Sequence, residues 1–218
     1  SGGMSTFYMV DRVDASDRTV SLDEQCKRLA LRMDVPRTAW EFYIHQQLLC
    51  RLPGEHALAR ARLGKLHSLH LYKSRSFLIL EHSSHGTLEN MVNLFKAKKR
   101  SARAPLLPEA LVMFYAIELL RIVHAAHSVG VIHGSIACKN LLILAKESSS
   151  WGHWQPAMVD GWEDRGLSLI NWSQSVDTTA YPASSTFQYG EEEPWSFNRD
   201  AEQICDVVHQ LLFGEPLS

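Results

Sequence analysis

Histidine and cysteine are the residues here that most readily bind metals or react, and their spacing favours neither a metal site nor a redox pair. Eleven histidines include three pairs three residues apart, yet no His-Glu-x-x-His sequence occurs, and only His124 and His127 lie in a helical stretch. The four cysteines are scattered, and none has Cys-x-x-Cys spacing. We therefore expect no bound metal, no cofactor and cysteines that stay reduced.

The remaining polar residues that could do chemistry lie in two short segments. One runs from His133 to Asn140, directly after a long apolar stretch. The other is Asn171-Trp172-Ser173, which follows the apolar run Leu167-Ser-Leu-Ile170. What either segment can do depends on the elements that position it.

The first third of the chain has the pattern of β-strands with one helix. Strands are expected at 7–13, 28–33, 66–72 and 76–81, the last two forming a hairpin. Thr38-Ala-Trp-Glu41 has the pattern of a capping box, in which the Thr38 hydroxyl accepts from the amide of residue 41 and Glu41 bonds back. The helix that it opens stops at Pro53-Gly54.

After residue 86 the pattern is mainly helical. Thr87 is expected to cap a helix that runs to about Phe95, and Pro108 to start a long, buried helix that ends near Gly130. A last helix is expected from about 199 to 213. Short strands at 141–144 and 167–172 flank an insertion, residues 146–166, that is rich in serine, glycine and tryptophan.

This order of elements is the layout of a protein kinase. The 218 residues suit one α+β domain of two lobes, a small antiparallel β lobe with one helix and a shortened, mainly helical lobe. We expect the domain at 4–218, with an N-lobe at 4–81, a hinge at 82–86 and a C-lobe at 87–218. Residues 1–3 are interpreted as a cloning remnant. A net charge of −2 argues against non-specific nucleic-acid binding, and the longest apolar run, 111–120, is too short to span a membrane.

The segment from His133 to Asn140 has the spacing of a kinase catalytic loop. It resembles the His-Gly-Asp-Ile-Lys-Pro-Asp-Asn version found in the Bub family of mitotic spindle-checkpoint kinases and pseudokinases. Four other parts of the chain resemble that family in the same order: 40–44, 86–94, 166–177, and 193–197 with 212–214. The resemblance covers about residues 28 to 214. It implies a kinase-like C-terminal domain of a longer protein, and its degree of decay points to the kinetoplastids.

Matched residue by residue, the resemblance places neutral side chains where phosphoryl transfer requires charged ones. Ser135 stands at the position of the catalytic aspartate, and a serine hydroxyl is too weak a base to replace it. Ala137 stands at the position of the catalytic-loop lysine. Asn140, a metal ligand in active kinases, is kept, but one amide without a carboxylate is a poor magnesium site.

The metal-binding Asp-Phe-Gly motif aligns in one of two ways. Asp160-Gly-Trp162 supplies an aspartate but lies inside the insertion. Asn171-Trp172-Ser173 follows a strand and continues to Asp177 as in the Bub family, and we favour it. This alignment replaces the aspartate with neutral Asn171 and the hinge glycine with Ser173. It also suggests that the bulky Trp172 indole fills the adenine or metal space.

The N-lobe has lost its phosphate groups as well. Arg32 stands at the position of the strand lysine, and either pairs with Glu41 or is an exposed strand charge. The absence of glycine between Gly3 and Gly54 removes the loop that covers phosphates. Two features of the scaffold remain, since His133 is expected to anchor the catalytic loop and Asp200 to brace it.

The sequence therefore predicts an inactive protein-interaction or scaffold domain. The resemblance implies a kinetochore location in the nucleus and checkpoint proteins as partners, with a WD-repeat partner bound through regions outside this chain. No membrane or direct nucleic-acid partner is expected. Trp151, Trp154 and Trp162 either anchor a partner or pack locally. The alternatives are an atypical active kinase that uses Arg32 and Asp160, a magnesium-independent nucleotide sensor that uses Lys139, and an unrelated α+β domain.

Overall fold

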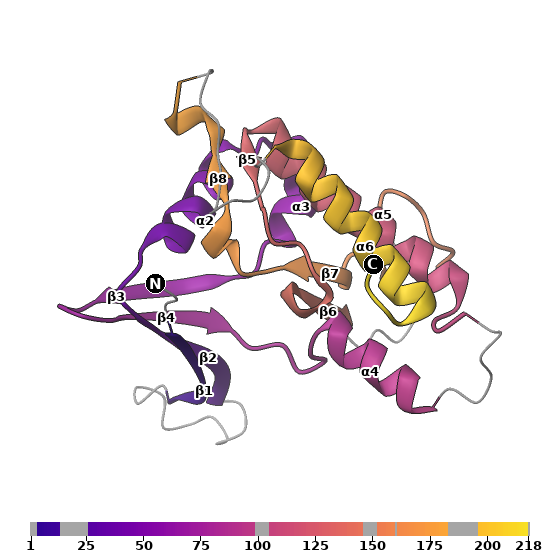
Figure 1. Ribbon diagram of the computed structural model, residues 1–218, viewed down its shortest axis with the longest axis horizontal. Coiled ribbons are helices and arrows are strands. Elements are labelled where there is room, and N and C mark those ends of the chain that lie inside the picture. The colour runs from indigo at the N-terminus through magenta and orange to yellow at the C-terminus, as the bar shows by residue number, and fades with distance from the viewer. Residues whose placement is uncertain are drawn as a thin grey trace.

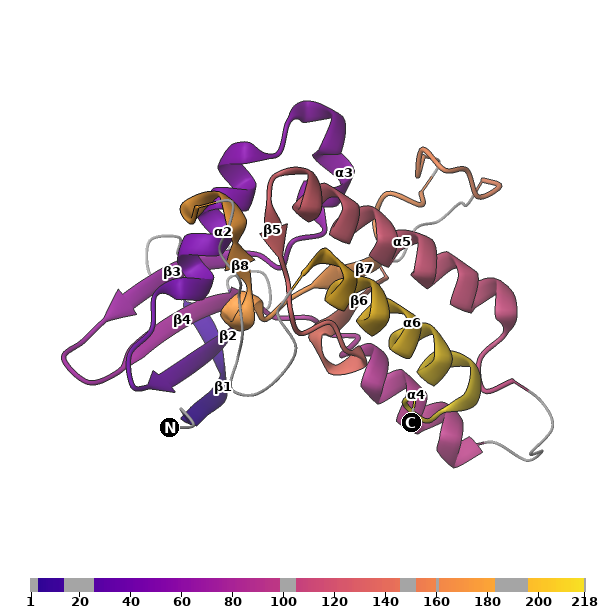
Figure 2. The same cartoon turned by 45° about the horizontal axis from the view of Figure 1, so that its top comes forward.

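The computed structural model describes residues 4–13, 26–98, 105–145, 152–159, 161–182 and 196–217. Its larger β-sheet gathers on one side and its three long C-terminal helices on the other, which gives two lobes (Figures 1 and 2). The expected α+β, kinase-like fold with an antiparallel N-lobe sheet is confirmed.

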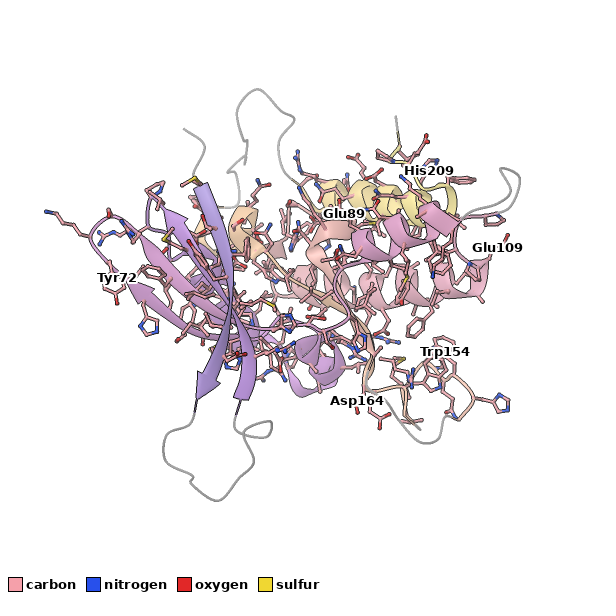
Figure 3. All side chains as sticks on the ribbon, turned by 90° about the horizontal axis from the view of Figure 1, so that it is seen from below. Tyr72, Glu89, Glu109, Trp154, Asp164 and His209 are labelled. Atoms are coloured by element: carbon pink, nitrogen blue, oxygen red, sulfur yellow. The ribbon has the colours of Figure 1, made fainter. Side chains whose placement is uncertain are left out.

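The N-lobe is a four-stranded antiparallel sheet in the order β1-β2-β4-β3. Its strands are β1 (Met4–Val13), β2 (Cys26–Val35), β3 (Leu66–Leu71) and β4 (Ser76–Glu81). The β3–β4 hairpin closes where the Tyr72 amide donates to the Arg75 carbonyl at 2.9 Å, and Figure 3 shows Tyr72 at the far end of the lobe. All four predicted strands are present because their alternating pattern is a local property of the sequence.

Helix α2 (Trp40–Arg51) starts one residue later than expected, with Ala39 in place of Thr38 as its cap residue, and the predicted capping box is wrong. The Thr38 hydroxyl accepts from the Trp40 amide at 3.4 Å, and the Thr38 amide donates to Ser76 Oγ at 3.1 Å. Glu41 turns into the protein instead of back to the cap. Pro53 ends α2 as predicted, but η1 (Gly54–His56) and α3 (Ala57–Ala61) follow, so the prediction of a single helix before residue 82 was also wrong.

The C-lobe is built on α5 (Glu109–Ser128), which packs against α6 (Phe197–Phe213). Helix α4 (Leu88–Lys98) begins beside Thr87, whose hydroxyl accepts from the Asn90 amide at 3.3 Å as a cap. Pro108 is the residue before α5, not its first turn. Among the described helices, α5 alone has the length and apolar composition of a membrane span, yet eight of its residues are buried here. Its composition is accounted for by its place in the core.

Seven short elements of the described residues complete the C-lobe and shape the site. Strand β5 pairs with β8 and β6 with β7, both antiparallel. A strand was predicted at 167–172, but β7 ends at Leu169 and Trp172 lies in a short helix. The elements are β5 (Val131–Ile132), η2 (Cys138–Asn140), β6 (Leu141–Ala145), β7 (Arg165–Leu169), η3 (Trp172–Gln174), β8 (Val176–Asp177) and η4 (Thr178–Ala180).

The two lobes are joined by backbone hydrogen bonds next to the site. The Leu169 amide donates to the Arg62 carbonyl at 3.0 Å, and the Gly64 amide donates to the Leu169 carbonyl at 3.1 Å. A Cβ atom at Gly64 would lie 2.5 Å from Ile170 Cγ2, so this close approach needs glycine. Residues 62–64 thus add an edge to the β6–β7 hairpin.

The described part of the insertion packs onto α5. The Trp162 ring lies 5.5 Å from the Phe114 ring, and its Nε1 donates to the Gly152 carbonyl at 3.0 Å. Trp154 is 38% exposed, and Figure 3 shows it in this loop, away from the sheet. Of the two predicted roles, Trp162 has the local packing role in this structure. Trp151 lies outside the described residues.

Candidate functional site

Arg32 and Glu41 form a buried ion pair between β2 and α2. Arg32 Nη2 lies 2.5 Å from Glu41 Oε2, and Arg32 Nε lies 3.1 Å from an Asp34 oxygen. Burial acts to lower the pKa of Arg32, but the two carboxylates outweigh it and the pKa is raised. Of the two interpretations of Arg32, the structure contains the ion pair. The pair fixes α2 against the sheet.

Trp172 continues this contact into the C-lobe. Its amide donates to Glu41 Oε1 at 3.2 Å, and its indole Nε1 donates to the Leu169 carbonyl at 3.2 Å. The ring packs edge-on against His133 at 4.6 Å and is 1% exposed. The indole is therefore a buried core side chain that packs beside α2 and His133.

The loop from His133 to Asn140 is braced from α6, as expected. Asp200 accepts hydrogen bonds from the amides of His133 at 2.8 Å and Gly134 at 2.7 Å, and its Oδ2 lies 2.8 Å from His127 Nε2. His133 Nε2 lies 3.2 Å from the Ile170 carbonyl. Burial lowers the pKa of His133 to about 4, so this imidazole is neutral at pH 7 and acts as an anchor.

Ser135, Asn140 and Asn171 meet in one hydrogen-bonded group, which we call the neutral cluster. Asn140 Nδ2 donates to the Ser135 carbonyl at 2.8 Å, and Asn171 Nδ2 donates to Asn140 Oδ1 at 3.2 Å. Ser173 Oγ donates to Asn171 Oδ1 at 2.8 Å. Asn171 has a φ of 66°, a left-handed conformation that asparagine tolerates better than most residues.

The neutral cluster does not fit a magnesium ion. Asn140 Oδ1, the oxygen that would face a metal, already accepts from Asn171, and both side chains are neutral. Ala137 contributes no charge. Within the described ranges, no three His, Cys, Asp or Glu side chains gather as a metal site. Mg²⁺ prefers carboxylates and phosphate oxygens, so the chain's own residues offer little here. Asp160 lies outside the described residues.

A second ion pair, which the sequence did not reveal, joins the end of α2 to β8. Arg51 Nη1 and Nη2 donate to the two Asp177 oxygens at 2.8 and 2.7 Å, and Tyr43 Oη donates to Asp177 at 3.2 Å. These bonds, Arg51 first, lower the pKa of Asp177 to about 2. One signal was present: Arg51 continues the buried helical face of Glu41 and Leu48 at steps of seven and three residues.

A third contact reinforces the same side of α2. Trp40 Nε1 donates to the Ser175 carbonyl at 2.8 Å, and the Trp40 ring stacks on Tyr43 at 5.3 Å. In Figure 2, β8 and the short turns around it lie directly beside α2. Helix α2 is thus held in its first turn and at its end by residues 172–177.

Comparison with known proteins agrees with this arrangement. No family model matches the chain. The Arabidopsis thaliana mitotic checkpoint serine/threonine-protein kinase BUB1 is 30% identical over 196 residues, which is 84% of this chain and 36% of that protein. The Mus musculus BUB1 is 32% identical over 225 residues, covering 97% and 20%. The chain therefore spans only 20% to 36% of the length of these relatives.

Solved structures give the same answer for the fold. A crystal structure of the BubR1 kinase domain superimposes with a TM-score of 0.73 at 25% identity, covering 90% of this chain and 57% of that chain. The BUB1 of Saccharomyces cerevisiae, 29% identical, matches 98% of this chain and 21% of its own length. The resemblance to the Bub family is thus confirmed, and the chain is a kinase-fold domain homologous to the Bub1 mitotic checkpoint kinases.

Proposed function

We propose that this domain is a catalytically inactive, kinase-like interaction module of a spindle-checkpoint or kinetochore protein that promotes chromosome segregation. The names of the relatives support the checkpoint role, and a nuclear, kinetochore location follows from it. One observation carries the inactivity: Asn140 Oδ1 is taken up by Asn171 inside a cluster that holds no carboxylate among the described residues.

The chemistry of phosphoryl transfer supports this proposal. Transfer needs a base for the substrate hydroxyl and metal ions that neutralise the phosphates. Ser135 supplies no base at neutral pH, and Asn171 supplies no charge to a metal. The loss of both groups removes most of the barrier lowering that such an enzyme needs. The scaffold around them is kept, which suits binding of protein partners, with a WD-repeat partner contacted outside this chain.

A magnesium-independent nucleotide sensor is the second candidate. Lys139 is exposed next to Asn140 and could offset phosphate charge there. Such a sensor would bind ATP equally well in EDTA. An atypical active kinase that depends on Asp160 would instead bind and transfer phosphate only with magnesium.

Thermal unfolding with ATP distinguishes the three candidates. A ligand at 100 times its Kd stabilises the native state by about 2.7 kcal/mol, a visible shift in Tm. We expect no shift with millimolar ATP, either with magnesium or with EDTA. A shift in EDTA would favour the sensor. A magnesium-dependent shift, together with phosphate transfer that is lost in Asp160→Ala, would overturn the proposal.

A further inference from the structure

A hollow of about 450 Å³ lies between α2, α3 and the start of β3, apart from the neutral cluster. We call it the α2–α3 pocket. In Figure 2, α2 and α3 are the two purple helices that arch over the top of the molecule. The pocket's walls are mainly apolar: Leu49 of α2, Ala57 and Ala61 of α3, Leu63 between α3 and β3, and Leu66 of β3. Burial of an apolar group there is favourable.

The rim of the α2–α3 pocket is basic. Arg60, Lys65 and His67 line it and are exposed, and no aspartate or glutamate is among its lining residues. Lys65 Nζ lies 3.3 Å from a Glu81 oxygen, but that pair is solvated and weak. A positive rim is notable on a chain with a net charge of −2. Electrostatic complementarity therefore favours an anionic occupant.

His45 adds a separate sign of an occupant. It lines the pocket from α2, is 3% exposed, and neither ring nitrogen meets hydrogen-bond geometry with a described group. Burial lowers the pKa of His45, and a hydrogen bond with the Gly64 backbone, too weak to meet strict geometry, raises it by less. Buried polar atoms without partners are rare in native proteins. The Gly64 contact involves one ring nitrogen at most, so a polar group of an occupant can pair with the other.

We propose that the α2–α3 pocket binds an acidic peptide segment of a protein partner, in which a carboxylate stands beside a large apolar side chain. The apolar side chain fills the hollow, and the carboxylate pairs with Arg60 and Lys65. Arginine forms strong, two-pronged bonds with carboxylates, which makes Arg60 the main contact. The inference rests on the proposed role as an interaction module, and it is independent of whether the domain transfers phosphate.

The test is fluorescence anisotropy with a labelled, capped peptide of sequence Gly-Phe-Glu-Phe-Gly and its matched glutamine peptide. We expect the glutamate peptide to bind, and the glutamine peptide to bind about tenfold more weakly. The double variant Arg60→Glu/Lys65→Glu should lose binding by about tenfold or more. Lys73→Glu, which makes half of that charge change on the exposed β3–β4 turn, should leave binding unchanged. All these positions are exposed, so the variants should fold.

Three outcomes would overturn the proposal. The first is no binding up to about 1 mM peptide, which corresponds to about 4 kcal/mol of binding free energy. The second is equal binding of the glutamate and glutamine peptides. The third is an equal effect of the Arg60→Glu/Lys65→Glu and Lys73→Glu variants on binding. Displacement of the peptide by inorganic phosphate at a similar concentration would mean a site for free anions, and would also contradict it. The NMR resonances of the His45 imidazole should shift when the glutamate peptide is added to the protein. The Lys73→Glu substitution alone, without peptide, should leave these resonances in place. The ATP thermal shift is a separate measurement, so either proposal can fail alone.

Discussion

The neutral cluster lies within a few residues of the two ion pairs on α2, Arg32–Glu41 and Arg51–Asp177, which we call the charged face of α2. The two regions differ in whether the groups that form them carry charge. At Ser135, Asn140 and Asn171 the hydrogen bonds join neutral groups. On α2, the two ion pairs Arg32–Glu41 and Arg51–Asp177 join fully charged groups instead. Charge is thus present where it fixes the helix and absent where a metal and phosphates would require it.

This difference teaches what a kinase-like scaffold needs for folding as opposed to catalysis. A carboxylate beside Asn140 would be left without a cation in the absence of magnesium, whereas a neutral amide is satisfied by its neighbours. The carboxylates of Glu41 and Asp177 have permanent arginine partners, so they stabilise the fold without any ligand. The charged face can be tested by removing charge and the neutral cluster by adding it.

The largest effect is expected from Glu41→Ala. It leaves the buried Arg32 guanidinium with only Asp34 and removes the acceptor of the Trp172 amide, so the free energy of unfolding should fall by about 3–5 kcal/mol. Chemical denaturation measures this loss. The double variant Arg32→Met/Glu41→Leu should recover most of it, because apolar residues can replace a buried pair. A loss below about 1 kcal/mol in Glu41→Ala would show that the Arg32–Glu41 pair does not stabilise the fold, and would contradict the comparison.

The next effect is the pH dependence that Asp177 brings. Its folded pKa of about 2 lies below its ordinary value, so the contribution to stability is complete above that ordinary value and is lost as pH falls through about 2. At pH 7 this is about 2 kcal/mol. Urea unfolding of the protein and of Asp177→Asn should therefore differ most at neutral pH. The difference should shrink between about pH 5 and pH 2, and a constant difference would contradict the assignment.

A smaller effect is expected when charge is added to the neutral cluster. Asn171→Asp replaces the donor to Asn140 Oδ1 with a carboxylate, so stability should fall by about 1 kcal/mol. Millimolar Mg²⁺ should restore it, because the site then has a charged oxygen ligand. Asn171→Ala loses the same hydrogen bond and should show no response to Mg²⁺. Thermal unfolding of both variants with Mg²⁺ and with EDTA makes the comparison.

The smallest effect is expected from Ser135→Ala. Asn140 bonds mainly to the Ser135 carbonyl, at 2.8 Å, and only weakly to its hydroxyl, at 3.5 Å. Removal of the hydroxyl should change the free energy of unfolding by less than about 0.5 kcal/mol. A larger loss in urea denaturation would show that the neutral cluster depends on this side chain after all.

The elements of this fold were predictable where their signals are local. The strands and the long helices follow from hydrophobic periodicity, and Thr87 from the cap pattern. The capping box at Thr38 failed because Glu41 has stronger partners, Arg32 and Trp172, that are distant in sequence. The short α3 lacks the several turns that make periodicity readable.

The sequence predicted which residues form the site better than it predicted which of them form hydrogen bonds or ion pairs with one another. The spacing from His133 to Asn140 and the family resemblance identified the residues that meet. Nothing in the sequence joined Arg51 to Asp177, which are 126 positions apart and make an ion pair through tertiary packing alone. The size of Trp172 suggested a plug in the cleft, but its apolar body and its indole donor are both satisfied in the core.

The edge that residues 62–64 add to the β6–β7 hairpin has a consequence for how the protein opens. Gly64 belongs to the N-lobe in chain order, yet its amide bonds to Leu169 of the C-lobe. Separation of the lobes would break this bond and the bond from the Leu169 amide to the Arg62 carbonyl together, and would expose both amides to water. The amides of Gly64 and Leu169 should therefore exchange with solvent deuterium at one common rate, set by opening of both lobes as a single cooperative unit.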